Sequence, residues 1–185
     1  MKYHCLSQKE YQKGEYSLVP LRHDDILQVR KWRNDQRRIL RQQKQLSIAQ
    51  QNRYFEEEVK PTYRRKEPEM ILFSFLKDGE CIGYGGLVHI DWHVRKAEVS
   101  FLLATERMED DDLFQGEFAR FLTLLFRVRE ELQLHRLHSE LFDIRPKMVE
   151  VLQAFGFHLE GLLKDHALVD GEYVDSLIYG LTFAD

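Results

Sequence analysis

The chain has 185 residues with 43% hydrophobic content and four prolines, so it can bury one ordinary core, and a single domain over residues 1–185 is expected. Its apolar runs are too short to cross a bilayer, and its two cysteines have no CxxC spacing, which predicts a cytoplasmic protein without a membrane partner. The net charge of −4 conceals a basic segment, residues 22–46, with eight basic and three acidic side chains. That segment fits an anionic substrate, a nucleotide, RNA or simply a solvated helix face.

The first predicted elements are a strand and a helix. Residues 14–21 alternate in polarity and predict a strand, placed at a sheet edge because Pro20 cannot donate to a ladder. Residues 1–13 are left as a candidate flexible extension. A helix then begins near Asp24 and Asp25, which suit its first turn. Its predicted inward side chains are Ile26, Val29 and Trp32.

A second helix follows a basic connector over residues 36–46. Ser47 and Gln50 have the spacing of a capping box, which marks the start of this helix. Its predicted inward side chains are Ile48, Phe55 and Val59. Pro61 and the basic residues 64–66 are expected to end it.

The middle of the chain predicts three antiparallel strands and a long helix. Asp78-Gly79 is a hairpin turn between strands 70–76 and 80–90, and a third strand covers residues 97–104. The helix spans residues 113–132 and has a continuous apolar stripe. Three glycines in the second strand predict a bulge or a close backbone approach, and no phosphate loop, because no helix follows them. They are Gly83, Gly85 and Gly86.

The last third reads as strand, helix and hairpin. Residues 136–142 alternate as a strand, Pro146 suits the first turn of a helix, and Gly156 ends that helix. Asp170-Gly171 then predicts the turn of a final hairpin.

Several short motifs in this order resemble the GNAT superfamily of N-acyltransferases. They are Trp32-Arg33-Asn34 on the first helix, Gly156-Phe157 and Glu160-Gly161 near the end, and the terminal hairpin DG.Y.DS..YGL. The resemblance implies an α+β fold with a mixed, mainly antiparallel sheet of six to seven strands, flanked by about four helices. It also implies that the fourth and fifth strands, residues 97–104 and 136–142, splay apart to admit acetyl-CoA as co-substrate.

The resemblance also implies a catalytic carboxylate. The segment AEVSF, residues 97–101, is similar to the fourth-strand pattern that carries a glutamate base in some members, which selects Glu98. A carboxylate in an apolar cleft can have a raised pKa that suits proton transfer. The competing interpretation is a structural glutamate paired with Arg95 or Lys96. His89 is the reserve catalytic candidate, with Asp91 beside it on the acceptor side.

Other site residues follow from the same resemblance. The backbone near Phe101, Leu102 and Leu103 is expected to bind the pantetheine arm and the oxyanion. Trp32, Arg33 and Asn34 are the acceptor candidates, although a tryptophan at helical spacing is more often a core residue.

The phosphate cradle departs from the family pattern Q/R-x-x-G-x-G/A. Gln115 and Gly116 remain as cofactor candidates, but the acidic residues 109–112 beside them would repel a pyrophosphate. Arg145 stands where an asparagine is common and could contact coenzyme phosphates. Leu152 stands where a tyrosine acid is common, and it has no proton to donate.

A metal site is not expected. His89 and His93 would stand roughly 13 Å apart along a regular strand, too far to share one ion. The sequence therefore favours an acetyl-CoA-dependent N-acetyltransferase acting on a primary amine of a small molecule or a nucleotide-linked amino sugar. Protein N-terminal amines and a non-catalytic binding role are the alternatives, and a homodimer is left open. RNA binding through Arg37, Arg38 and Arg41 is disfavoured, since aromatic residues are not interleaved with them.

Overall fold

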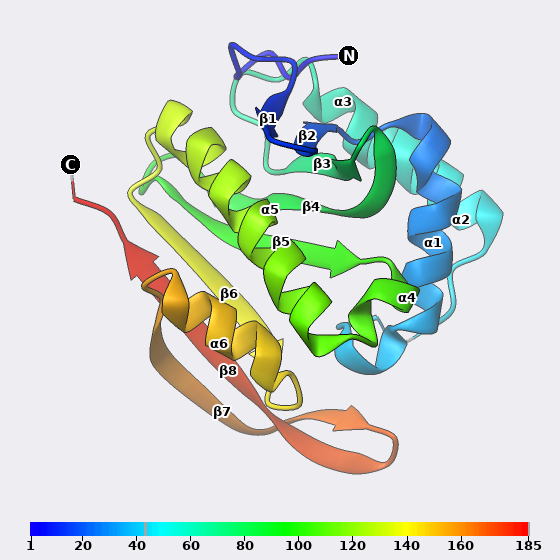
Figure 1. The fold of residues 1–185 in the computed structure, drawn as a ribbon, viewed down its shortest axis with the longest axis vertical. Helices are drawn as coiled ribbons and strands as arrows, with labels where there is room; N and C mark the ends of the chain where they lie inside the picture. The colour runs from blue at the N-terminus through cyan, green and yellow to red at the C-terminus, as the bar shows by residue number, and fades with distance from the viewer. Residues whose placement is uncertain (43, 185) are drawn as a thin grey trace.

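The computed structural model describes residues 1–42 and 44–184 and has the expected α+β architecture (Figure 1). Within those residues one eight-stranded sheet runs in the order β1-β2-β3-β4-β5-β6-β8-β7. Neighbouring strands in this sheet pair antiparallel, except β5 and β6, which pair parallel. The fourth and fifth strands of the sequence prediction are β5 and β6.

The helices and strands occur in the predicted order, with one additional strand, β1, at the start. The strands are β1 (Tyr11–Lys13), β2 (Tyr16–Pro20), β3 (Ile71–Lys77), β4 (Glu80–Asp91), β5 (Lys96–Leu103), β6 (Arg136–Phe142), β7 (His158–Val169) and β8 (Glu172–Thr182). The α-helices are α1 (Ile26–Asp35), α2 (Ile48–Tyr54), α3 (Lys60–Thr62), α4 (Thr105–Met108), α5 (Asp111–Glu131) and α6 (Pro146–Ala154). Short turns η1 (His23–Asp25) and η2 (Arg37–Ile39) flank α1, and a π-helical turn η3 (Phe55–Val59) joins α2 to α3.

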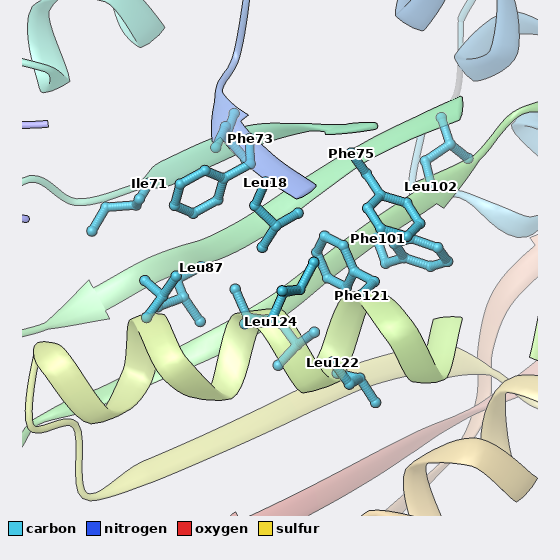
Figure 2. Close-up of a cluster of buried hydrophobic side chains, with 14 of the residues drawn as sticks. Leu18, Ile71, Phe73, Phe75, Leu87, Phe101, Leu102, Phe121, Leu122 and Leu124 are labelled. Atoms are coloured by element: carbon cyan, nitrogen blue, oxygen red, sulfur yellow. The ribbon is translucent and has the colours of Figure 1, made fainter. Parts of the chain in front are cut away.

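Part of the core lies between the sheet and α5, which crosses the front of the strands together with α6 in Figure 1, and the same core includes Trp32 of α1 and Phe55 of η3. Phe121 of α5 meets Phe101 of β5 at a centroid distance of 4.6 Å and Phe75 of β3 at 5.6 Å (Figure 2). Because side chains alternate along a strand, Glu98 and Ser100 point to the opposite face from Phe101. The two faces of β5 therefore have different surroundings.

The N-terminal residues are not a flexible extension, which corrects the expectation for residues 1–13. Tyr3 is fully buried, and its hydroxyl donates to the Leu72 carbonyl and accepts from the Leu72 amide, both at 2.8 Å. Strand β1 begins at Tyr11 and lies outside β2 in the sheet. The pairing between β1 and β2 ends at Leu18, opposite Tyr11. Pro20 lies beyond that pairing, so its missing N–H leaves the ladder between the two strands intact.

Two further details of the helices and strands differ from or refine the prediction. The capping box at Ser47 is present, but Ile48 is 53% exposed, because only later turns of this helix reach the core. The predicted glycine-rich irregularity in β4 is confirmed, since the register shifts opposite Phe75 and again after Val88. A Cβ at Gly85 would lie 2.2 Å from the Ser100 carbonyl oxygen, which confirms the close backbone approach.

Candidate active site between the splayed strands

The two parallel strands at the centre of the sheet pair only at one end. β5 and β6 are joined from Lys96 opposite Arg136 to Glu98 opposite His138, and they then diverge (Figure 1). Beyond Glu98 the β6-facing edge of β5 has no strand neighbour among the described residues. The splay expected between the fourth and fifth strands is therefore present, and Glu98 stands where it begins.

A cavity of about 80 Å³ occupies the fork between these strands, and we call it the fork cavity. Its walls include Phe101, which faces α5, and Glu98 and Ser100, which face the opposite side. The wall thus includes residues whose side chains lie on both faces of β5. Its other walls come from the connector, from β6 and from α6: Ile39, Leu40, Arg41, Val99, Ser139, Glu140, Leu141, Phe142, Arg145 and Met148.

The edge of β5 offers backbone groups to this cavity at alternate residues. Gln36 donates to the Leu103 carbonyl at 2.8 Å, so the backbone groups of Leu103 point away from β4. In an antiparallel ladder the same direction applies to every second residue, which includes Phe101, whereas Leu102 faces β4. The backbone groups of Phe101 thus face the gap, and their role in binding stays a prediction. The expectation for Leu102 is corrected, and the Leu103 carbonyl is already occupied by Gln36.

Among the residues that line the fork cavity, two buried polar atoms have no hydrogen-bond partner within residues 1–42 and 44–184. They are Ser139 Oγ on β6 and Arg145 Nη2 at the start of α6, and both residues line the fork cavity. Buried polar groups are nearly always paired, so these two atoms indicate a ligand with polar groups in this cavity. They fit the amides and phosphates of a coenzyme A molecule. Sequence reasoning selected Arg145 but missed Ser139, whose role no local motif indicates.

The start of α5 is less suited to a phosphate. Asp110 caps the helix by accepting from the Leu113 amide at 2.9 Å, and Asp111 follows as a first-turn carboxylate. Gln115 and Gly116 lie in the second turn, where backbone amides are bonded within the helix. The Gln115 side chain donates to Glu150 at 2.6 Å. A cofactor role for these two residues stays a prediction without a supporting contact.

Arg145 allows a direct test of the coenzyme side. Burial lowers its pKa to about 10, so the folded protein pays for the charge at every pH below that value. Arg145→Met should therefore raise the free energy of unfolding at pH 7 by about 1–3 kcal/mol. The same change should weaken coenzyme A binding about tenfold or more, because a charged hydrogen-bond donor is lost. Denaturant unfolding and calorimetric titration with coenzyme A measure the two effects.

Lys147→Met is the matched control, since Lys147 lies on the same helix and pairs only with the exposed Glu150 among the described residues. Lys147→Met should change neither the free energy of unfolding nor the affinity for coenzyme A appreciably. A less stable Arg145→Met variant that binds coenzyme A normally would show that Arg145 has only a structural role.

On the face of β5 opposite Phe101, Glu98 is 7% exposed and forms an ion pair with Arg41 of the connector. His89 Nε2 lies 3.7 Å from Glu98 Oε2 and is itself 73% exposed. The cation that pairs with Glu98 thus comes from 57 residues away, and no short-range pattern relates the two residues. The reserve candidate His89 lies beside the predicted base.

A larger open groove of about 700 Å³ continues outward from the fork cavity and shares Leu40, Arg41 and Phe142 with it. Asn34 lines this groove and holds the connector by accepting from the Leu46 amide at 2.8 Å. The remaining walls are Asp35, Arg37, Arg38, Gln42, His166, Ala167, Leu168, Val169 and Asp170. We call it the outer groove.

The other acceptor candidates lie outside both cavities. Trp32 is 1% exposed within the hydrophobic core, which corrects its assignment as an acceptor contact. Arg33 donates to Gln42 at 3.0 Å and so shapes the connector. Asp91 accepts from the backbone amides of His93 and Val94 in the β4–β5 turn.

Residues 1–42 and 44–184 contain neither a metal-ligand cluster nor a membrane-spanning helix. No group of three or more histidine, cysteine, aspartate or glutamate side chains is placed to hold a metal ion. None of the helices in these ranges is both long and apolar enough to span a membrane.

Comparison with known proteins gives consistent results. The family model of an acetyltransferase (GNAT) domain matches residues 18–178. A Bacillus subtilis (strain 168) protein, YdaF, whose name describes a ribosomal N-acetyltransferase, is 29% identical over 129 residues, which cover 69% of this chain and 68% of that protein.

Two solved structures share the fold at low identity. Spermidine N-acetyltransferase from Vibrio cholerae, in complex with CoA and spermine, has a TM-score of 0.76 and 18% identity, covering 92% of this chain and 96% of that chain. Ribosomal-protein-S5-alanine acetyltransferase from Vibrio fischeri has a TM-score of 0.70 and 16% identity, covering 95% of this chain and 97% of that chain.

Proposed function

Because the chain belongs to the GNAT family of acetyltransferases, we propose that it moves an acetyl group from acetyl-CoA to a primary amine of a small molecule or a nucleotide-linked amino sugar. The fork cavity carries this proposal. It joins a side with unsatisfied polar donors, Ser139 and Arg145, to a side with a buried carboxylate, Glu98. In this proposal the thioester and the amine meet at the fork, each approaching from a different face of the sheet.

The residues at the fork have separable roles in this chemistry. Acetyl-CoA supplies an activated thioester. Glu98 accepts a proton from the acceptor ammonium, which frees the nitrogen to form the new C–N bond as the C–S bond breaks. The Phe101 amide faces the gap and can stabilise the oxyanion. Leu152 is fully buried and cannot protonate the departing thiolate, but a thiol pKa near 8.5 allows the thiolate to leave as it is.

Release of free thiol from acetyl-CoA in the presence of an amine panel tests this proposal. The panel should include glucosamine, a nucleotide-linked amino sugar, spermidine and a peptide with a free N-terminus. We expect amine-dependent thiol release with at least one member. No release above the hydrolysis background, together with no coenzyme A binding by calorimetry, would remove the proposal.

A protein N-terminal amine is the second candidate acceptor. The relative from Bacillus subtilis and the structure from Vibrio fischeri carry names of ribosomal acetyltransferases, and the outer groove is open enough for an extended peptide end. Preference for the peptide over the sugars in the same panel would favour this acceptor.

A further inference from the structure

One guanidinium bridges the two splayed strands on the acceptor side. Arg41 binds Glu98 of β5 and, through Nη1, Glu140 of β6 at 3.2 Å. The side chains of the two glutamates are 7% and 22% exposed, whereas that of Arg41 is 49% exposed. Two shielded carboxylates thus converge on one accessible cation at the fork.

Three histidines lie near the two glutamates. His89 faces Glu98 at 3.7 Å, and His166 Nδ1 lies 3.7 Å from Glu140 Oε1 while bonded to Ser176 Oγ at 2.8 Å. His138, paired beside Glu98 in the sheet, has its pKa lowered by burial. Two carboxylates at one site are unfavourable without a cation between them. The Arg41 guanidinium is the cation between these two carboxylates.

We infer that Glu98 and Glu140 together form the binding site for the acceptor's ammonium group, and that Arg41 fills this site in the free protein. This inference rests on the proposed function and adds Glu140 and Arg41 to it. A primary ammonium carries the same charge as the guanidinium and donates the same kind of hydrogen bond to carboxylates. Binding of the acceptor is then an exchange of cations, after which Glu98 is free to accept the proton.

Two features make the exchange physically accessible. The Arg41 side chain is half exposed and long, and the connector has separate attachments through Arg38 to Asp170 at 2.9 Å and through Asn34 to Leu46. Arg41 can therefore swing into the outer groove, which it also lines, without releasing the connector. The apparent acceptor affinity is then reduced by the fraction of molecules in which Arg41 occupies the site.

Arg41→Ala tests the exchange. It should lower the acceptor KM about three- to tenfold, as expected for removing a partly exposed ion pair that competes with the substrate, and leave the KM for acetyl-CoA unchanged. Arg41→Lys keeps a competing cation and should stay near the wild-type value. Arg64→Ala removes the same charge at an exposed site outside both cavities and is the control for net charge.

Glu140→Gln tests the other half of the inference. It should raise the acceptor KM about tenfold, since a hydrogen bond between charged groups is weakened, again without changing the KM for acetyl-CoA. In the Arg41→Ala background the Glu140→Gln effect should persist, because Glu140 then acts on the acceptor directly. A purely structural Glu140 would instead lower stability and change both KM values.

Direct binding separates this inference from the proposed function. Calorimetric titration of the CoA-saturated protein with spermidine needs no turnover and should show tighter binding to Arg41→Ala and weaker binding to Glu140→Gln. Weaker binding to Arg41→Ala would overturn the exchange, because Arg41 would then be a binding residue. Absence of thiol release with every amine would count against the proposed function alone.

Discussion

Glu98→Gln is expected to lower kcat by about 10²- to 10³-fold while the KM for acetyl-CoA changes by less than about twofold. Glutamine has the shape of glutamate and can still accept a hydrogen bond, but it cannot take a proton from the acceptor. Glu98 is the buried carboxylate at the point where β5 and β6 separate. Steady-state thiol release, measured with each substrate varied in turn, gives kcat and the KM for acetyl-CoA.

The same variant distinguishes three interpretations. A large loss of kcat with unchanged thermal unfolding supports Glu98 as the base. If kcat persists in Glu98→Gln and falls in His89→Gln, the neighbouring histidine is the base. If the Glu98→Gln protein keeps its full function in cells, the non-catalytic alternative, which the acidic start of α5 favours, is the better account.

Gly86→Ala should have the largest effect on stability, with a loss of about 3 kcal/mol or more. Gly86 has φ of +154°, and a Cβ there would lie 2.0 Å from the Ile71 carbonyl oxygen and 3.1 Å from the Leu72 Cα. Both obstacles are backbone atoms of β3, so relief requires the strands to move apart. A fall in melting temperature of about 6 °C or more is expected for a chain of this length.

Gly116→Ala is the matched control, because it makes the same chemical change on the open face of α5. No heavy atom lies within 4 Å of a Cβ at this position, which is an exposed helix residue. Alanine should therefore raise stability by roughly 0.5–1 kcal/mol through helix propensity. Denaturant unfolding of both variants should show stability changes of opposite sign, a loss for Gly86→Ala and a gain for Gly116→Ala. Equal stability of Gly86→Ala and wild type would mean that β3 and β4 are less closely packed than the structure shows.

The sequence by itself determined the order of the elements and the turns between them. Asp78-Gly79 and Asp170-Gly171 predict hairpin turns, and all four residues have positive φ, between 50° and 86°. The capping box at Ser47 is likewise present. These features are local, because a turn or a cap depends on residues at most a few positions apart. The family resemblance then selected Glu98, Phe101 and Arg145, which the fold brings to one cavity.

Only the tertiary structure decided what surrounds those residues. Arg41 lies 57 residues from Glu98 and 99 from Glu140, and no short-range pattern relates the three. The burial of Tyr3 and of Trp32 likewise depends on partners from distant strands and helices. An ion pair or a core contact depends on which surfaces meet after the sheet forms. The sequence could therefore place a carboxylate at the fork, but only the folded chain shows that a second carboxylate and a guanidinium share its site.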